Sequence, residues 1–512
     1  MALANVKSAG VFGIDGYTVE VETDSYNGMP GIEIVGLPDN AVKESKERVK
    51  SAIKNSGYNF PQKRIIINLA PANVKKEGVY LDLPIACAIL ISSGQIQPNA
   101  ADGFLIVGEL ALDGSLRPAS GILSMAVAAR QMGLKNIIIP FENAKEAAVV
   151  DGINVYGASN FKQVVSHLRG GELIAPTKVD IDGIFKNSSN YDIDFEDVKG
   201  QENAKRALEV AAAGAHNCLM IGSPGSGKTM LAKRLPTILP DLSFEEALEV
   251  TKIYSIAGKL NGSQSLVTKR PFRSPHHTIS NVGMTGGGSI PKPGEISLAH
   301  RGVLFLDEFP EFRKDTIESM RQPIEDGMFT VSRVAGSASF PSSVMLIASM
   351  NPCKCGYFGD PTRECTCSPV QIQNYLGKIS GPMLDRFDIH MEVPSVKYDE
   401  LSSGEKGEKS KYIKERVQKA RQRQLDRYKG MNIYSNSQLS AAGIDEFCRI
   451  DEASKNLLKG AFEKLGLSAR AHARILKVAR TIADLDGSDD IRPQNIAEAI
   501  QYRSLDKKYW FK

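Results

Sequence analysis

Long apolar runs are missing from this 512-residue chain: no stretch approaches the roughly 18 consecutive apolar residues that a membrane-spanning helix needs. The first residues, MALANVKSAGVFGIDG, also lack the basic-then-apolar layout of a secretory signal, so we expect a cytoplasmic protein. An excess of charge of one sign is missing as well, because 63 Lys and Arg face 59 Asp and Glu. Any contact with nucleic acid therefore has to come from local clusters of basic residues.

Cysteine is scarce, and seven residues in a cytosolic chain argue against a disulfide framework. Three of them stand among apolar residues and are predicted to be core side chains: Cys87, Cys218 and Cys448. The other four crowd into a C-x-C-x9-C-x-C pattern on a Gly/Pro-rich loop: Cys353, Cys355, Cys365 and Cys367. Four thiolates can close around one tetrahedral Zn²⁺ and staple such a loop. Because C-x-C is tighter than the commoner C-x2-C, reduced thiols without metal remain the alternative.

A nucleotide-binding loop is the most informative feature present. After the apolar run CLMI, predicted to be a buried strand, the sequence GSPGSGKT matches the pattern G-x-x-x-x-G-K-[ST]. Lys228 is expected to reach the β- and γ-phosphates of ATP and Thr229 to hold Mg²⁺, while residues 230–235 form the helix behind them. The remaining residues expected to cradle the phosphates are Gly222, Ser223, Pro224, Gly225, Ser226 and Gly227.

A pair of acids follows a second apolar run in the sequence GVLFLDE. A strand over residues 303–306, buried on both faces, would deliver the pair to its carboxyl end, where ligands of open α/β sheets bind. Asp307 is then expected to bind Mg²⁺, directly or through water, and Glu308 to act as the base for an attacking water. The alternative is a core strand that ends in two solvated acids, which the upstream phosphate loop disfavours.

Three more positions are candidates for the same site. Asn351, at the end of the strand VMLIASMNP, is placed to orient the attacking water, unless it only starts an Asn-Pro turn. Arg386, in LDRFD, is a candidate to reach the nucleotide of a neighbouring subunit, the alternative being a salt bridge with Asp385 or Asp388. Arg470, near the start of SARAHARILKVARTIADL, is a candidate γ-phosphate sensor, or part of a solvated helical face.

The chain divides into four parts by pattern. Residues 1–170 predict a mixed α/β unit, in which residues 11–21 alternate around an Asp15-Gly16 turn and a helix follows an Asp39 cap. Residues 171–194 are polar and turn-rich and predict a linker. Alternating strands and helices over 195–395 predict a parallel sheet, and 396–512 predict helices, with a strongly basic stretch at 406–430.

Taken together, these motifs make the whole chain similar to the YifB/ComM family of magnesium-chelatase-like AAA+ ATPases, from the first residues to about residue 508. The motifs that carry the resemblance are GSPGSGKT, RPFRSPHHTIS, PGEISLAHRGVLFLDE, MNPCKCG, LDRFD and KVARTIADL. The resemblance implies an AAA+ P-loop α/β domain with a C-terminal helical lid. It also implies a hexameric ring with ATP and Mg²⁺ at each subunit interface and, for the competence members, an ATP-driven role in DNA branch migration.

The N-terminal part resembles the Lon-protease fold, a ribosomal S5 domain 2-like α+β domain, through the segment VGELALDGSLRPASGI. A Lon-type protease needs a nucleophilic Ser and an activating Lys. The corresponding region EGVYLDLPIAC contains no Ser, and Leu123 occupies the position of the Lys. We therefore expect no peptide hydrolysis and a role in assembly or DNA contact.

Two segments are candidates for DNA contact, because loops repeated around a ring can grip a phosphate backbone without reading its sequence. One is the predicted hairpin 328–341 around Arg333. The other is 268–288, with the basic residues Lys269, Arg270, Arg273, His276 and His277. For the two histidines, a buried hydrogen-bonded site or a contact with a neighbouring subunit is the alternative. The stretch at 406–430 is more typical of a solvated helix.

The sequence therefore predicts a Mg²⁺-dependent ATPase ring that translocates on or remodels DNA. Two other classes remain open. A chelatase-type motor would act on a large partner subunit, and a protein remodeller would act on polypeptide; neither predicts stimulation of hydrolysis by DNA.

Overall fold

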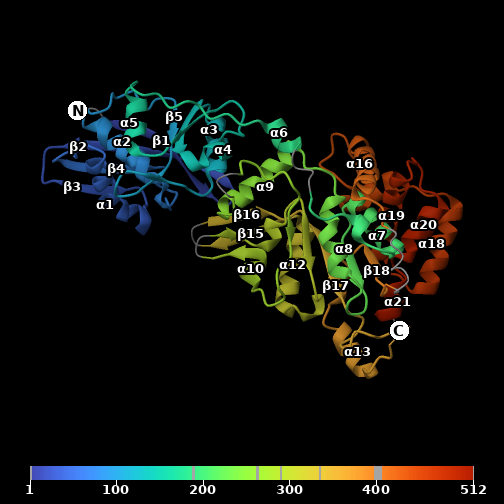
Figure 1. Ribbon diagram of the computed structural model, residues 1–512. Helices are drawn as coiled ribbons and strands as arrows, with labels where there is room; N and C mark the ends of the chain where they lie inside the picture. Colours follow the sequence, from blue (N-terminus) through green and yellow to red (C-terminus); the bar gives the residue numbers. More distant parts are fainter. Residues whose placement is uncertain are drawn as a thin grey trace.

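The computed structural model describes residues 3–186, 191–260, 264–288, 291–333, 336–361, 363–396 and 406–510. Figure 1 shows a unit of strands and helices at the N-terminus, a second sheet with its helices in the middle, and a group of helices at the C-terminal side. In these described ranges, no helix is both long and apolar enough to cross a membrane.

The N-terminal unit is built on a seven-stranded mixed sheet with the order β3-β4-β2-β1-β5-β8-β9. Its elements are β1 Ala4–Phe12, β2 Asp15–Tyr26, β3 Gly31–Val35, α1 Asn40–Asn55, β4 Arg64–Ala70, η1 Val79–Leu81, α2 Asp82–Ser92, β5 Phe104–Ile106, β6 Glu109–Leu110, β7 Leu116–Arg117, α3 Ile122–Gln131, β8 Asn136–Pro140, η2 Phe141–Asn143, α4 Ala144–Ala147, β9 Asn154–Ala158 and α5 Phe161–Leu168. Helix α2 is buried along its whole length and Cys87 lies within it, as predicted.

Two local predictions for this unit have different outcomes. The Asp39 cap is confirmed, because its carboxylate accepts a hydrogen bond of 2.8 Å from the Val42 N–H at the start of α1. The predicted turn at Asp15-Gly16 is wrong, since both residues pair with β1 inside the ladder. The turn lies two residues earlier, at Gly13. Its φ is +64°, a value that glycine adopts without steric cost.

The middle unit contains a five-stranded sheet in the order β11-β14-β17-β10-β18, with every neighbouring pair parallel. All residues of β10, β14 and β17 are buried, which explains their continuous apolar sequences. Its elements are α7 Glu202–Gly214, β10 Cys218–Ile221, α8 Lys228–Arg234, η5 Leu235–Thr237, α9 Phe244–Ile256, β11 Phe272–Arg273, α10 Asn281–Thr285, β12 Gly286–Gly287, β13 Lys292–Pro293, α11 Glu295–Leu298, β14 Val303–Leu306, η6 Phe309–Glu311, α12 Lys314–Asp326, β15 Met328–Arg333, β16 Gly336–Pro341, β17 Met345–Met350, α13 Pro369–Leu376, α14 Gly381–Leu384 and β18 Ile389–Glu392.

The segment between the two sheets carries two short helical pieces, α6 Ile181–Lys186 and η4 Phe195–Asp197. The first lies inside the stretch for which the sequence predicts a linker without regular structure. None of its residues is buried, so it is a local turn of helix and not part of either core.

The C-terminal part is helical, and ion pairs hold its basic helix to neighbouring helices. The elements are α16 Ser410–Arg427, η7 Asn436–Gln438, α17 Ala441–Phe447, α18 Glu452–Leu465, α19 Ala469–Leu485, α20 Pro493–Gln501 and α21 Leu505–Tyr509. In α16, Arg416 pairs with carboxylates of Glu209 and Glu408, and Arg427 pairs with the buried Asp484. The charges of these arginines thus tie α16 to α7 and α19, which is a more specific role than the solvated helix that the sequence suggested.

Helix α3 of the N-terminal unit packs on α9 of the middle unit through a shared apolar cluster that contains the buried Leu123. A buried carboxylate lies within this contact. Glu146 accepts hydrogen bonds from the Leu123 N–H, at 3.0 Å, and from the Ser255 hydroxyl, whose oxygen also accepts from the Gly121 N–H. Burial raises the pKa of Glu146. The segment around Leu123 therefore forms part of the contact between the two units.

The hairpin of β15 and β16 is confirmed, but one of its faces is covered. Val331, Ala338 and Phe340 form a small apolar cluster with Ile14 from the turn between β1 and β2. The tip at residues 334–335 and the side chain of Arg333 lie outside the described residues. The hairpin thus joins the N-terminal unit to the middle unit, as Figure 1 shows.

Candidate functional site

The phosphate loop joins the carboxyl end of β10 to the N-terminus of α8. Gly225 and Gly227 have φ values of +78° and +86°, in the left-handed region that favours glycine. Gly222 is required for a different reason: a Cβ at this position would lie 2.3 Å from the carbonyl oxygen of Val393. The loop is therefore held open for phosphate by its glycines, in the position predicted from the sequence.

Lys228 points into this loop. Its ammonium donates hydrogen bonds to the carbonyl oxygens of Gly222, at 2.8 Å, and Ser223, at 2.9 Å, and to the Asn351 side-chain oxygen at 3.2 Å. Burial lowers the pKa of Lys228 to about 8, and the nearby carboxylates Asp307 and Glu308 partly oppose this shift. A buried ammonium ringed by loop carbonyls is placed to neutralise phosphate charge.

The two predicted Mg²⁺ ligands meet directly. The hydroxyl of Thr229 donates a 2.7 Å hydrogen bond to one carboxylate oxygen of Asp307, and the hydroxyl of Ser349 donates to the other. Hydroxyl and carboxylate oxygens beside a phosphate loop are the donor set that Mg²⁺ prefers. The residues present therefore fit a Mg²⁺ ion, with Thr229 and Asp307 as its protein ligands.

Glu308 and Asn351 reach the same edge of the sheet from different strands. Glu308 follows β14, and Asn351 follows β17, which lies between β14 and the phosphate-loop strand β10. The Glu308 carboxylate is exposed, whereas the backbone N–H of Glu308 donates a 3.1 Å hydrogen bond to the Asp307 carboxylate. Parallel strands thus bring Lys228, Asp307, Glu308 and the Asn351 amide to one edge of the sheet, where the sequence places them.

Three residues at this site were not identified in these roles from the sequence. Ser349 orients Asp307, and Gln201 donates to the Ser226 carbonyl oxygen at 2.6 Å, which fixes the phosphate loop from outside. His277 lies beside Glu308, with 3.8 Å between Nδ1 and the nearer carboxylate oxygen. No local pattern marks the first two. His277 lies four residues after β11, the neighbour of β14, but only the structure shows that these two strands pair.

Arg386 lies at the opposite edge of the sheet. It lines a cavity of about 490 Å³ together with Asn217 and Gly302, which directly precede β10 and β14. The amino and carboxyl ends of a four-residue strand are ~13 Å apart, so Arg386 is remote from the phosphate loop of its own chain. Its ion-pair partner is Glu325, whereas the sequence suggested Asp385 or Asp388.

Arg470 is also on the side of Arg386. Its guanidinium donates to Asp385 at 2.9 Å, and Arg474 donates to the other oxygen of the same carboxylate at 3.3 Å. The side chain of Arg470 is 64% exposed, so it stands at the surface beside Arg386. The structure therefore brings the two predicted arginines together, but not with the phosphate loop of the same chain.

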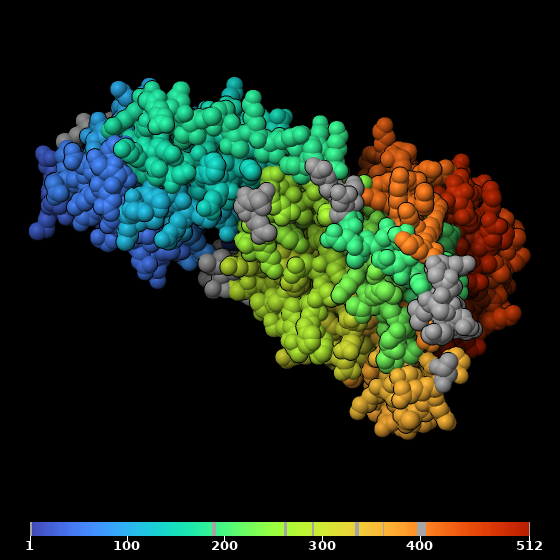
Figure 2. Space-filling view, in the orientation of Figure 1, coloured from blue at the N-terminus to red at the C-terminus, as the bar shows by residue number. Residues whose placement is uncertain are grey.

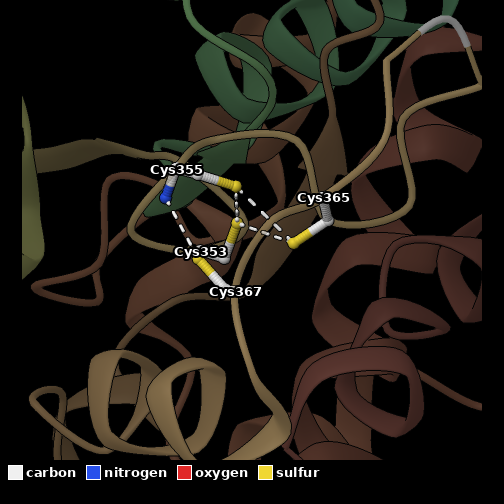
Figure 3. A group of neighbouring side chains, drawn as sticks. All are labelled: Cys353, Cys355, Cys365 and Cys367. Carbon is white, nitrogen blue, oxygen red and sulfur yellow. Dashed lines mark hydrogen bonds between the residues drawn. The ribbon is translucent and has the colours of Figure 1, made fainter.

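The predicted cysteine cluster is formed. Figure 3 shows the four side chains converging from two turns of one loop, and their Sγ atoms all lie within 4.8 Å of one another. The sulfurs of Cys353 and Cys365 are 3.7 Å apart, close to the ~3.8 Å edge of a tetrahedron with 2.3 Å Zn–S bonds. Backbone N–H groups of Cys355 and Gly356 donate to the sulfurs of Cys367 and Cys353. Four thiols in this arrangement fit a Zn²⁺ ion.

The cysteine loop touches the phosphate loop. Figure 2 shows the lobe around α13 projecting from the body. In the cysteine loop, a Cβ on Gly356 would lie 2.5 Å from Cδ of Pro224. We expect Gly356→Ala to weaken ATP binding about tenfold, because the methyl group displaces Pro224 and because φ at this position is +90°. Titration of the protein with a fluorescent ATP analogue measures this effect.

Gly359→Ala is the matched control for this substitution. Gly359 lies in the same loop and also has a positive φ, of +77°, but the atom nearest to its Cβ position is Cε of Lys508 at 3.6 Å. We expect near wild-type affinity for ATP in this variant. Equal weakening in both variants would show that general strain in the loop, and not the contact with Pro224, is responsible.

Two of the arginines proposed for DNA contact have other roles. Arg270 donates to the Pro240 and Arg301 carbonyl oxygens and pairs with Glu246 at 2.9 Å. Arg273 forms a two-point ion pair with Glu295, at 2.6 and 2.7 Å. Their charge is used within the chain, so the prediction that these two line a DNA path is not supported.

Three family models match the chain. Magnesium chelatase, subunit ChlI, matches residues 194–401; subunit ChlI of Mg-chelatase matches 21–143; and magnesium chelatase, subunit ChlI C-terminal, matches 407–503. The chain is 44% identical over 508 residues to the uncharacterized protein YifB of Escherichia coli, covering 99% of this chain and 98% of the relative. It is 43% identical over 509 residues to the competence protein ComM of Haemophilus influenzae, with the same coverage. The chloroplastic magnesium-chelatase subunit ChlI of Nicotiana tabacum is 23% identical over 331 residues, covering 60% of this chain and 71% of that protein.

Proposed function

This chain belongs to the YifB/ComM family of magnesium-chelatase-like proteins, and from that membership we propose that it is a Mg²⁺-dependent ATPase that works as a ring on DNA in the cytoplasm. The observation that carries the ATPase proposal is the convergence of Lys228, Thr229, Asp307 and Glu308 at one edge of a parallel sheet. Phosphoryl transfer to water needs a cation at the phosphates, ligands for Mg²⁺ and a base for the attacking water. These four side chains have the chemistry for those tasks.

Hydrolysis joins a water oxygen to the γ-phosphorus, breaks the bond to the bridging oxygen of ADP and releases one proton. Glu308 takes the proton from the attacking water, and the Asn351 amide, beside Lys228, orients that water. Lys228 stabilises the charge on the phosphate oxygens. Mg²⁺, when held by Thr229 and Asp307, would supply further charge neutralisation at the phosphates. Removal of free Mg²⁺ by a chelator is expected to stop hydrolysis.

A ring assembly, which we propose to be a homo-hexamer, explains the position of Arg386. The arginine lies at the amino edge of the sheet and the phosphate loop at the carboxyl edge, so a second copy is needed to bring them together. A head-to-tail contact that presents one edge to the other closes into a ring when the rotation permits. Arg470, beside Arg386, would reach the same neighbouring nucleotide. The mass of the particle in solution with ATP tests the number of copies.

The proposed DNA substrate rests on the relative named as a competence protein and on the surface near Glu308. The exposed residues His276 and Thr278 flank His277, which lies beside the proposed base, and the segment continues into α10. Six copies of this segment would present it around a ring, where DNA contact and hydrolysis would be adjacent. The test is ATP-dependent displacement of a labelled strand from a four-way DNA junction. We expect displacement by the wild type and none by Glu308→Gln.

For the cysteine cluster, we propose one structural Zn²⁺ per chain. A loop of this polarity has little apolar surface to bury, so the metal would supply its folding energy. We expect the purified protein to contain about one zinc per chain and Cys365→Ser with Cys367→Ser to lose it. Because Gly356 contacts Pro224, the metal-free variant should also bind ATP more weakly. Metal analysis showing no zinc in a protein that binds ATP normally would contradict this proposal.

The N-terminal unit is proposed to be a Lon-protease-like domain that has lost peptidase chemistry and serves assembly or DNA contact. Leu123, at the position of the missing lysine, is buried in the contact with α9. An apolar side chain there packs the two units together and has no proton to exchange with a nucleophile.

A protein substrate is the second candidate. The observation in its favour is that all three family models are named for a magnesium chelatase subunit and together cover most of the chain. A chelatase-type or remodelling ATPase would be stimulated by a partner protein and not by DNA. The two candidates therefore differ in one measurable property.

A further inference from the structure

Three arginines gather on the wall of the cavity at the amino edge of the middle sheet. Arg270, Arg301 and Arg421 are among its lining residues, and we call them the arginine cluster. Arg270 donates a 2.7 Å hydrogen bond to the Arg301 carbonyl oxygen. Tyr434 joins the other two, because its ring centroid is 4.9 Å from the Arg301 guanidinium and its carbonyl oxygen accepts from Arg421 at 3.0 Å. The proposed hydrolysis uses none of these three side chains.

Carboxylates balance only part of the charge of this cluster. Glu246 lies 2.9 Å from Arg270 and 3.8 Å from Arg301. Arg301 also reaches Glu249 at 3.0 Å, but the side chain of Glu249 is exposed to solvent and does not line the cavity. In the part of the chain that the structure describes, Arg421 has no carboxylate oxygen within 4.0 Å, so the surplus positive charge rests on this residue.

The guanidinium of Arg421 also has a donor without an acceptor. Its two terminal nitrogens donate to the carbonyl oxygens of Tyr434 and, at 3.3 Å, Ala212. Its Nε is buried and has no hydrogen-bond partner among the described residues. Burial, and next to it the charge of Arg270, lowers the pKa of Arg421 to about 10. A buried cation without a counter-ion destabilises a folded chain, so an anion bound here gains from both the charge and the free donor.

The other acids of the cavity do not supply this counter-charge. Three of the four pair with the basic residues Arg386 and Arg474, and the fourth is exposed to solvent. In that order they are Glu325, Asp385, Asp388 and Asp326. The surplus charge of the arginine cluster is thus left for a ligand.

We propose that the arginine cluster binds a small anion that carries a phosphate group, at a site separate from the phosphate loop. A phosphate offers three acceptor oxygens and about two negative charges, so it can accept from Arg421 and face Arg301 together, whereas a carboxylate has one charge. The planar fork of a guanidinium also matches phosphate geometry. At about 490 Å³, the cavity lies within the ~300–1,000 Å³ range of small-molecule sites. This site goes beyond the proposed ATPase activity and does not depend on it.

Titration calorimetry with inorganic phosphate tests the site in full-length chains that carry Lys228→Ala. This substitution disables the phosphate loop of the chain and of any neighbouring copy, so the binding that is measured belongs to another site. We expect phosphate to bind to these chains. Adding Arg421→Met, which keeps most of the bulk of the side chain but removes its charge and its donors, should weaken that binding at least about tenfold.

Glu246→Gln should act in the opposite direction. It removes the carboxylate that Arg270 and Arg301 share, while a glutamine can still accept the 3.2 Å hydrogen bond from the Ser243 N–H at the start of α9. Phosphate should then bind about threefold more tightly or better, because less of the charge of the cluster is neutralised. General damage to the fold predicts weaker binding in both variants.

Arg423→Met is the matched control. Arg423 stands two residues further along α16, pairs with the exposed Asp489 and does not line the cavity, so its loss should leave phosphate affinity unchanged. Thermal unfolding confirms that each variant is folded. Unchanged affinity in Arg421→Met, or equal weakening in Arg423→Met, overturns the inference. If Arg421→Met does not fold, unchanged or weaker binding by Glu246→Gln overturns it.

Two further results would place the phosphate elsewhere. Arg386→Ala, on the same cavity, should keep most of the phosphate affinity, and loss of binding in this variant but not in Arg421→Met would assign the anion to Arg386. Absence of phosphate binding in the Lys228→Ala chain would overturn the inference as well. Neither result bears on the proposed ATPase activity, which is measured as hydrolysis by the wild type.

Discussion

Glu308→Gln is expected to lower the rate of ATP hydrolysis at least about 100-fold while ATP binding is retained, since a glutamine cannot accept the proton of the attacking water. The affinity for ATP should survive because Lys228 and the phosphate loop are untouched. In this variant Asp307 keeps its hydrogen bonds from Thr229 and Ser349, so the proposed Mg²⁺ ligands stay in place. Phosphate release and nucleotide titration measure the two effects separately.

Lys228→Ala is the contrasting variant. Its side chain is expected to contribute binding as well as catalysis, because its ammonium lies at the centre of the phosphate loop. We expect both ATP affinity and hydrolysis to be lost. If Glu308→Gln hydrolysed ATP at the wild-type rate, the assignment of the base would be wrong and another acid near the loop would have to be found.

Arg386→Ala is expected to lower hydrolysis about 1000-fold or more, in the range seen when an arginine that stabilises transferred phosphate is removed. ATP binding to the isolated chain should change little, because Arg386 lies at the other edge of the sheet from the phosphate loop. The loss of its ion pair with the exposed Glu325 should have a small effect on stability.

Mixing two inactive variants shows whether Arg386 acts on a neighbour. In a mixed ring, a chain with Arg386→Ala offers an intact phosphate loop, and an adjacent Lys228→Ala chain offers an intact arginine. If equal amounts of the two variants assemble at random, about a quarter of the subunit interfaces combine an intact phosphate loop with an intact Arg386. About a quarter of the wild-type sites should therefore be restored. No recovery in rings shown to be mixed would mean that Arg386 serves only its own chain, in which case the ring proposal loses its structural support.

The parts of this site that the sequence predicts are those in which chemistry and strand pattern coincide. The phosphate loop follows a buried strand, and Asp307 and Glu308 follow another, so local sequence is sufficient to place them at one edge. The four cysteines are likewise close in sequence, and their convergence needs only one loop.

The parts that the sequence does not predict depend on strand order and on contacts between distant segments. Nothing in the sequence places β17 between β10 and β14, or aligns β11 with β14 so that His277 meets Glu308. The partner of Arg386 is Glu325, 61 residues away, although Asp385 adjoins the arginine and Asp388 follows it by two residues. Arg386 therefore pairs with a residue of α12, which packing brings close, and not with an acid near it in sequence.

The most direct test of the central claim is steady-state ATP hydrolysis by the purified protein without DNA and with single-stranded, duplex and branched DNA, using Glu308→Gln as the baseline. An ATP-driven motor on DNA predicts that at least one DNA raises the wild-type rate severalfold and leaves the variant inactive. Equal wild-type rates with and without every DNA would contradict a DNA substrate and point to a protein partner.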